Sequence, residues 1–288
     1  MIEVMLMREK ILFKTSNGTA VTTSYLLKAL ETVKADDAEI LFIHTEMSLG
    51  IPNMELSRHE IMEELFAIFS RLGTRTLCVP TFTFSFCNGQ DYDVTNSKCK
   101  MGAFNEYFRK RSDTVRSIDP LMSIALFGKD SDLINNTGKN SVGKDSTFDL
   151  LHGKNNVRFL FLGTSPGACM TYTHYVEAML NVPYRYNRQF TGAITDNKGN
   201  TYEDTYTLFV RYQGVIPATD NRLQKYLLSN GSLLCAQCGD SSVYCITEKD
   251  AYGYTKEQIE KNIDYMLDCP YPRKHLDDTF EVKDMVAL

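Results

Sequence analysis

The sequence predicts an α/β fold, a layered mixed β-sheet flanked by helices. Short apolar runs bounded by turn residues alternate with amphipathic patterns of ten or more residues, which is typical of strands alternating with helices. A hairpin pattern at 190–213, with Asp196-Asn-Lys-Gly199 as its turn, adds antiparallel strands. The sheet is therefore expected to be mixed rather than wholly parallel.

The individual elements follow from these two periodicities. Short runs of apolar residues between turn residues predict strands at 38–44, 74–80, 123–127, 158–162, 206–212, 232–237 and 243–247. Apolar residues that recur every three or four positions predict helices at 23–33, 58–71, 102–111, 171–180, 221–229 and 256–267.

The chain shows no internal repeat, low-complexity tract or Pro/Gly-rich linker. We therefore expect one domain over residues 1–288, with its motif-bearing core at about 20–270. The segment 84–100 lacks periodicity and is rich in Asn, Asp, Ser and Gly. Because a long irregular segment inside a compact domain is usually functional, we expect an active-site loop there.

Composition excludes several classes of protein. A formal net charge of −5 argues against a dedicated nucleic-acid binder. No run approaches the ~20 apolar residues of a membrane span, and residues 1–14 lack the apolar run of a signal peptide. We therefore expect a cytoplasmic protein whose partners include neither nucleic acid nor membrane.

Eight cysteines are expected to be reduced, chiefly buried thiols, because the chain is long and shows no export signal. Cys235 and Cys238 form a single CxxC pair on a strand pattern, so they point to opposite faces. A structural zinc site needs four ligands. No metal is expected.

The usual GxxxxGK[ST], GxGxxG, GxSxG and HExxH motifs are absent. What remains is a buried strand at 158–162, the turn Gly163-Thr-Ser-Pro-Gly-Ala168, and a helix carrying His174 and Glu177 on one face. A histidine placed beyond the carboxyl end of a core strand is well placed to meet a ligand. Spacing alone, however, favours a partly buried structural role for His174 and a solvated position for Glu177.

Four segments of the chain carry further patterns. The first two are Ile40-Leu-Phe-Ile-His-Thr-Glu-Met-Ser-Leu-Gly50 and Leu77-Cys-Val-Pro-Thr-Phe-Thr-Phe84. The third is Val115-Arg-Ser-Ile-Asp-Pro-Leu-Met-Ser123, followed by Gly143-Lys-Asp-Ser146, and the fourth is the Thr-x-x-His-x-x-Glu pattern that ends at Glu177. Together they resemble the antibiotic N-acetyltransferase family, which contains most aminoglycoside 3-N-acetyltransferases. They occur in the family's order and span most of the chain.

The resemblance implies the family's fold and direct transfer of an acetyl group from acetyl-CoA to an amine. It implies that His174 is the general base, oriented by a carboxylate among Glu177, Asp119 and Asp220. Asp119 stands where the family pattern has a histidine, and 213–220 lacks the glutamate that the aminoglycoside enzymes have there. The resemblance also implies contacts with acetyl-CoA, from Thr45, Ser48, Ser117 and Ser146. Cys169, one turn before His174, offers a rival route through an acetyl-thioenzyme.

Arginines interleaved with tyrosines in the segment 184–188 suit a diphosphate and a stacked base. We therefore expect the substrate to be a nucleotide-linked (UDP or dTDP) amino sugar of surface polysaccharide (O-antigen type) synthesis. Aminoglycoside 3-N-acetylation is the alternative, and a non-catalytic module that binds CoA or a sugar is a lesser one. The expected substrate contacts are Thr83, Asn88, Asp91, Tyr172 and Arg185.

Overall fold

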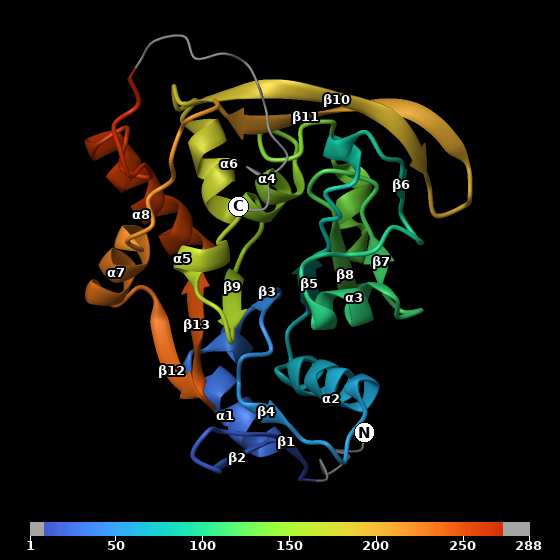
Figure 1. The fold of residues 1–288 in the computed structure, drawn as a ribbon, viewed down its shortest axis with the longest axis vertical. Coiled ribbons are helices and arrows are strands. Elements are labelled where there is room, and N and C mark those ends of the chain that lie inside the picture. Colours follow the sequence, from blue (N-terminus) through green and yellow to red (C-terminus); the bar gives the residue numbers. More distant parts are fainter. Residues whose placement is uncertain (1–8, 273–288) are drawn as a thin grey trace.

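The computed structural model describes residues 9–272, and its centre is a seven-stranded mixed sheet of order β12-β13-β9-β3-β5-β8-β7 (Figure 1). Its three inner strands, β3 (Ile40–Thr45), β5 (Thr76–Pro80) and β9 (Val157–Leu162), are parallel. The antiparallel strands on either side are β7 (Val115–Arg116), β8 (Ile124–Gly128), β12 (Leu234–Cys238) and β13 (Ser241–Thr247). The predicted fold class is confirmed.

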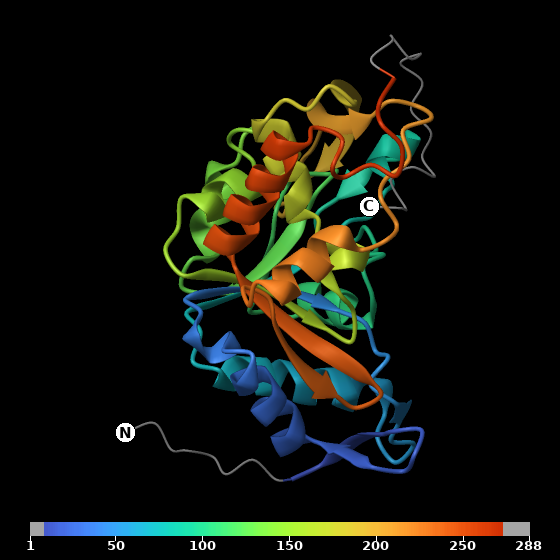
Figure 2. The ribbon, with the colours of Figure 1, turned by 90° about the vertical axis from the view of Figure 1, so that its left-hand side faces the viewer.

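Helices cover both faces of this sheet because its strands are buried on both sides. Along β3, Ile40 and Phe42 face one hydrophobic core, whereas Leu41 and Ile43 face the other. The first core is closed by α4 (Thr147–His152), α6 (Tyr172–Met179) and α8 (Glu248–Lys261), and the second by α1 (Thr23–Thr32), α2 (Arg58–Arg71) and α3 (Ala103–Arg109) (Figures 1 and 2). The result is a three-layer α/β/α arrangement.

Two smaller sheets flank the central one. One joins β1 (Ile11–Lys14), β2 (Ala20–Thr22) and β4 (Ile51–Pro52), and the other joins β6 (Tyr92–Asp93), β10 (Arg185–Thr195) and β11 (Thr201–Arg211). The predicted hairpin is confirmed, since the Asp196 carboxylate accepts from the amides of Lys198 and Asn200 in the turn. It begins earlier than predicted, which brings Arg185 to its base.

The last helix departs most from the prediction, since α8 spans Glu248–Lys261 instead of 256–267. Thr247 caps it by accepting from the amide of Asp250. Its buried stripe is Glu248, Ala251, Thr255 and Ile259, of which two members are polar, so the apolar periodicity is weak in the sequence. Other short elements are α5 (Pro166–Cys169), α7 (Arg222–Ser229), η1 (Ala35–Asp37), η2 (Phe86–Asn88) and η3 (Ser131–Asn136).

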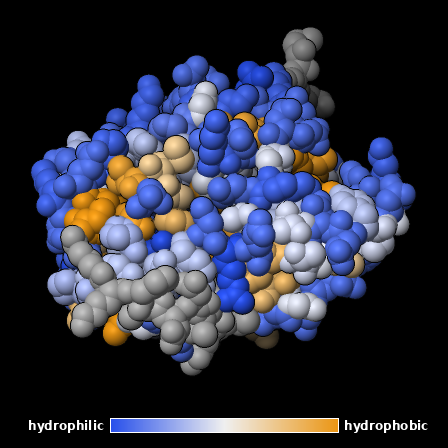
Figure 3. Space-filling model, turned by 90° about the horizontal axis from the view of Figure 1, so that it is seen from above, coloured by the Kyte–Doolittle hydropathy of each residue, from blue (hydrophilic) through white to orange (hydrophobic). Residues whose placement is uncertain are grey.

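The described surface carries its exposed large hydrophobic residues on several different elements, among them Ile51 in β4, Met179 in α6 and Tyr202 in β11. Seen from above, the molecule is mostly hydrophilic with small apolar patches (Figure 3). Within residues 9–272, no helix has the length and apolar character needed to cross a membrane. The ends of the predicted 1–288 domain lie outside the described residues, so the single-domain prediction stays a prediction.

The parallel arrangement of β3, β5 and β9 brings their carboxyl ends to one edge of the sheet. The segments that follow them, 46–47, 81–84 and 163–165, therefore lie around the same edge. In α/β sheets, ligands bind in the crevice outside the carboxyl ends of the strands. The fold thus assembles a binding region from segments that are far apart in the sequence.

The turn after β9 depends on Gly163, which has φ +70°, and a Cβ there would lie 2.0 Å from the carbonyl oxygen of Glu46. We expect Gly163→Ala to lower the free energy of unfolding by more than the roughly 1–2 kcal/mol that a left-handed φ alone costs. Denaturant unfolding measures this. The control is Gly199→Ala, because Gly199 has φ +83° and a Cβ there would meet no atom within 4 Å. An equal fall in the free energy of unfolding in both variants would contradict the clash at Gly163.

Candidate active site

His174 lies in α6, which follows β9 through the turn at Gly163 and the short helix α5. Pro166 occupies the first turn of α5, where its missing N–H costs nothing. The histidine lines a cavity of about 390 Å³, which we call the His174 cavity. Its walls come from α5, α6, the base of the β10–β11 hairpin, residues 217–224 and residues 266–267.

A buried polar network holds the imidazole. His174 Nδ1 lies 2.8 Å from Oε2 of Glu177, one turn along the same helix. Tyr184 donates its hydroxyl to Oε1 of Glu177 at 2.9 Å, and Nη2 of Arg185 lies 2.9 Å from Oε2. The same guanidinium nitrogen is 2.8 Å from Nδ1 of His174. Both carboxylate oxygens are therefore engaged, as a buried charge requires.

This environment keeps the imidazole neutral and the carboxylate charged. Burial and the positive charge of Arg185 lower the pKa of His174 to about 4, although Glu177 opposes them. Burial alone would raise the pKa of Glu177, but Arg185 and His174 outweigh it and hold that pKa at about 2. At neutral pH the pair is thus a neutral histidine beside a carboxylate.

Two partners compete for one ring nitrogen, and they favour opposite tautomers. If Nδ1 carries the proton, it donates to Glu177 and leaves the lone pair of Nε2 free to accept a proton. If Arg185 donates to a bare Nδ1, the proton lies on Nε2, which is then a donor. Only the first tautomer can act as a base through Nε2.

A second cavity, of about 510 Å³, lies at the carboxyl ends of β3 and β5, and we call it the strand-end cavity. It shares Ala168 and Cys169 with the His174 cavity. His44, on β3, lines this cavity and stacks on Phe161 with 5.0 Å between the ring centroids. Burial lowers the pKa of His44 to about 3. The two cavities therefore lie next to each other at α5.

The four residues expected to contact acetyl-CoA are divided by the fold. Thr45 lines the strand-end cavity and donates to Oδ1 of Asn105 at 2.9 Å. Ser48 donates to the carbonyl of Gly163 in the adjoining turn. Ser117 accepts from the amide of Ile124, and Ser146 caps α4, and both are buried outside the two cavities.

Among the three candidate carboxylates, Glu177 is the one that contacts His174 in the described structure. Asp119 is buried, accepts from the amides of Leu121 and Met122 and from Ser141, and has a pKa that burial raises. Asp220 is exposed and pairs with Arg222 at 2.8 Å. The substitution of a histidine by Asp119 therefore affects a loop rather than the surroundings of His174.

Of the expected substrate contacts, Arg185 lines the His174 cavity. Tyr172 is buried on the other face of α6 and donates its hydroxyl to the carboxylate of Glu248. Thr83 bonds to Ser85, the Asn88 amide donates to the carbonyl of Phe84, and Asp91 is exposed. None of these four residues lines either cavity. Of the segment 84–100, which was expected to form an active-site loop, Phe84 and Lys100 line the strand-end cavity.

Cavity residues that sequence analysis missed come mainly from the C-terminal half of the chain. They are Arg211, Pro217, Asn221, Arg222, Gln224 and Met266. No motif identifies them, because they belong to a hairpin end, a loop and a helix start that are brought together by packing. The one indication in the sequence was the segment 213–220, where the resemblance places the carboxylate that orients the catalytic histidine.

Cys169 touches both cavities, but its environment disfavours a thiolate. Its Sγ lies 3.4 Å from the carbonyl oxygen of Ser165 and 3.5 Å from the hydroxyl of Thr164. Burial raises the pKa of this thiol to about 11. Because the thiolate is the reactive form, this environment weakens the acetyl-thioenzyme route.

Among the described residues, no group of three or more His, Cys, Asp or Glu side chains could hold a metal ion. Cys235 is exposed and Cys238 is buried, as their opposite orientation on β12 requires. These two cysteines share a strand without sharing a face.

Comparison with known proteins identifies the family. The family model described as aminoglycoside 3-N-acetyltransferase matches residues 43–260. The chain belongs to this family. It is an N-acetyltransferase that uses acetyl-CoA. The alternative of a non-catalytic module that binds CoA or a sugar is therefore set aside. A comparison with curated proteins gives no match.

Solved structures share the fold of this acetyltransferase. YokD from Bacillus subtilis aligns with a TM-score of 0.69 and 14% identity over 88% of this chain and 95% of its own. AAC-IIIb in a binary complex with CoASH gives 0.69 and 16% over 87% and 98%. A histidine-to-alanine mutant of AAC(3)-IVa in complex with a gentamicin gives 0.67 and 17% over 91% and 93%.

We expect Arg185→Met to raise the pKa of His174 above about 4, because the variant removes a positive charge 2.8 Å from the ring. An NMR titration of the His174 ring protons measures this pKa. The control is Arg222→Met, in the same cavity but paired with Asp220. If the pKa of His174 does not rise in Arg185→Met, Arg185 does not set its charge.

Proposed function

We propose that this acetyltransferase transfers the acetyl group of acetyl-CoA directly to an amine of an aminoglycoside-type amino sugar, with His174 as general base. The observation that carries the proposal is the neutral His174, bonded to the buried Glu177, in a cavity that shares Ala168 and Cys169 with the strand-end cavity. One cavity holds the amine and the other the thioester arm. Both reacting groups then meet beside Ala168 and Cys169.

The reaction needs a base because the amine arrives as an ammonium, which has no lone pair. Nε2 of His174 takes one proton from the ammonium, and the freed nitrogen attacks the thioester carbonyl carbon. The C–N bond forms, the C–S bond breaks, and the thiolate of CoA takes up the second proton that leaves the nitrogen. The products are an N-acetylated sugar and CoA with a free thiol. Glu177 stabilises the imidazolium that forms in between.

An aminoglycoside-type substrate is supported by the family description and by neighbours crystallised with sisomicin and a gentamicin. The side chains of segment 184–188 also serve the fold. Tyr184 bonds Glu177, Tyr186 packs on Tyr212 at 4.6 Å, and Arg188 lies over Phe190. A nucleotide-linked sugar would need the tyrosines of this segment to stack on its base. Their packing and hydrogen bonding within the fold weaken that interpretation.

A nucleotide-linked amino sugar remains the second candidate because of the charges in the His174 cavity. Three arginines line it, Arg185, Arg211 and Arg222, of which Arg185 pairs with Glu177 and Arg222 with Asp220. Guanidinium groups suit phosphate or carboxylate better than they suit a polycation. A diphosphate attached to the sugar would complement these arginines.

We expect His174→Asn to lower kcat by about 10²–10⁴-fold, the usual contribution of a general base, or about 3–5 kcal/mol of barrier. Asparagine retains polarity and approximate size but cannot accept the proton. Release of CoA thiol in steady state measures kcat, and calorimetry with CoA checks that binding is retained. Turnover within a few-fold of the wild type would overturn the role of His174.

Cys169→Ser is the matched control, since Cys169 lies on the preceding turn and touches both cavities. Serine keeps the size of the side chain but forms no thioester. We expect normal turnover in this variant. A loss as large as that of His174→Asn would favour an acetyl-thioenzyme instead.

A panel of amines distinguishes the two substrate classes. We expect kcat/KM for kanamycin- or gentamicin-type amines to exceed that for UDP- and dTDP-linked amino sugars, all assayed by thiol release from acetyl-CoA. Glucosamine, which is neither polycationic nor nucleotide-linked, is the reference amine. A higher kcat/KM for the nucleotide-linked sugars would reverse the choice and assign the cavity arginines to a diphosphate.

A further inference from the structure

A second histidine, His44, lies at the carboxyl end of the parallel strands. It is the penultimate residue of β3 and is 6% exposed. Its ring stacks on Phe161 with an angle of 3° between the two planes, and it contacts Phe42 with 5.2 Å between the ring centroids. The two phenylalanine rings therefore hold the plane of the imidazole in one orientation.

The imidazole of His44 is buried without a polar partner. Within residues 9–272, neither of its ring nitrogens has a hydrogen bond. Neither nitrogen is among the fully enclosed polar atoms that lack a partner in that range, so the ring is open where it lines the strand-end cavity. A neutral imidazole has one N–H donor, and polar groups this deeply buried are normally bonded. His44 can therefore offer a hydrogen bond to a ligand in that cavity.

The charge state of His44 suits a donor that keeps its proton. Burial lowers the pKa of this ring to about 3, so the ring is neutral at physiological pH. A neutral N–H can polarise a carbonyl group without bringing positive charge into the cavity. An imidazolium in the same place would repel the ammonium form of an acceptor amine.

Several other side-chain donors of the strand-end cavity are already used or lie at its surface. Thr45 donates to Oδ1 of Asn105 at 2.9 Å, and Nδ2 of Asn105 donates to the carbonyl of Pro80 at 2.7 Å. Thr171 donates to a backbone carbonyl at 3.3 Å. Lys100 is exposed, and its ammonium is carried on a long flexible chain. His44 is thus a buried donor that is still available.

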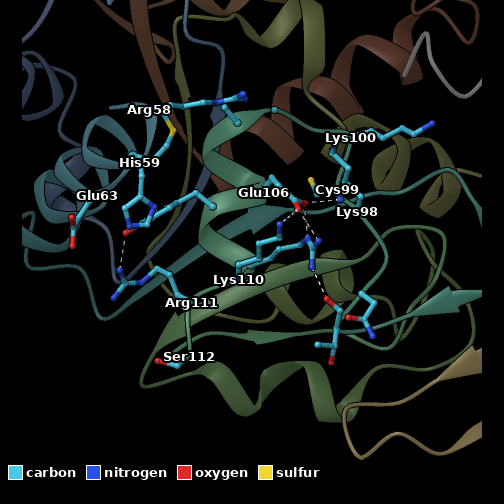
Figure 4. A pocket seen from close by; sticks show the side chains of 17 residues that line it. Arg58, His59, Glu63, Lys98, Cys99, Lys100, Glu106, Lys110, Arg111 and Ser112 are labelled. Carbon is cyan, nitrogen blue, oxygen red and sulfur yellow. Dashed lines mark hydrogen bonds and ion pairs between the residues drawn. The ribbon is translucent and has the colours of Figure 1, made fainter. Parts of the chain in front are cut away.

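Another wall of the cavity is fixed by α3 and the segment before it. Glu106, in α3, accepts from the amide of Cys99 at 2.8 Å and pairs with Arg109 at 2.6 Å, beside an open groove of about 1240 Å³ (Figure 4). These contacts hold the segment that continues into Lys100 and Met101, which line the strand-end cavity. Walls that are fixed before a ligand binds are what the stabilisation of a developing charge requires.

The strand-end cavity also reaches the helix that carries the proposed base. Thr171, which lies one turn before His174 and precedes the first residue of α6, lines this cavity of about 510 Å³ together with His44. A carbonyl group that accepts from His44 therefore shares a small cavity with the start of α6.

We propose that His44 is a catalytic residue of the acetyl transfer, whose ring N–H donates a hydrogen bond to the carbonyl oxygen of the acetyl thioester. When the amine attacks the carbonyl carbon, an electron pair of the C=O bond moves to this oxygen, and the hydrogen bond stabilises its negative charge. When the C=O bond forms again, the C–S bond breaks and CoA leaves as the thiolate. His44 keeps its proton throughout. The inference rests on the proposed function, because it requires the thioester arm to lie in the strand-end cavity.

The variant His44→Phe retains a ring that can stack on Phe161 but removes the donor. We expect kcat to fall by about 10²–10³-fold, the usual loss for one oxyanion donor. The Kd of CoA, measured by calorimetry, should not change, because CoA has no acetyl carbonyl. Turnover within a few-fold of the wild type would overturn the proposal. Weaker binding of CoA with an unchanged kcat would also overturn it, since the ring would then contact the pantetheine arm.

Rescue variants and a matched control test whether the N–H itself is needed. His44→Asn and His44→Gln place an amide N–H near the positions of Nδ1 and Nε2, and we expect one of them to recover part of the kcat lost in His44→Phe. The control is His152→Phe, the same replacement at a histidine that lines neither cavity, which should leave kcat unchanged. Equal kcat in the three His44 variants, or an equal fall in the control, would overturn the role of the N–H.

Infrared difference spectra separate this inference from the role of His174. Acetyl-CoA with ¹³C at the acetyl carbonyl is bound without an acceptor amine, so no turnover is needed. We expect the carbonyl band at lower frequency in the wild type than in His44→Phe, because the hydrogen bond weakens the C=O bond. His174→Asn should give the wild-type band, even if its turnover contradicted the role of His174. The same band in wild type and His44→Phe would overturn the proposal for His44 alone.

Discussion

The buried charge of Glu177 is the constraint on which the active site depends. A carboxylate that is 2% exposed must be matched by donors, because the desolvation of an unpaired charge costs several kcal/mol. Tyr184, Arg185 and His174 supply those donors. Since Tyr184 precedes β10 and Arg185 begins it, compensating this one charge also attaches α6 to the base of the hairpin.

The same network determines the protonation of His174. Burial and Arg185 disfavour the imidazolium, whereas Glu177 stabilises it. The ring is therefore neutral before reaction and has a carboxylate ready once it takes a proton. A neutral base beside a fixed anion suits a step in which positive charge on the ring is transient. The competition between Arg185 and Glu177 for Nδ1 adds a choice of tautomer, which the positions of these side chains decide.

The arrangement of cavities follows from sheet topology. Parallel pairing of β3, β5 and β9 brings three strand ends to one edge, where the strand-end cavity opens. The turn after β9 leads through α5 to His174, whose cavity shares Ala168 and Cys169 with the strand-end cavity. These two neighbouring cavities are the proposed places of the amine and the thioester arm.

The sequence by itself determined the α/β class, most strands and the hairpin, because these depend on local periodicity. It also put His174 and Glu177 on one helix face through their i,i+3 spacing, but it left Glu177, Asp119 and Asp220 open as partners of His174. Segments with weak periodicity, such as the start of α8, were misplaced. Only the tertiary structure decided that Arg185 and Tyr184 face Glu177 and that Asp119 serves a loop away from His174. Tyr184 follows Glu177 by only seven residues, but the way the chain passes from α6 into β10 decides which side chains turn back toward the carboxylate. No local periodicity in the sequence indicates that geometry.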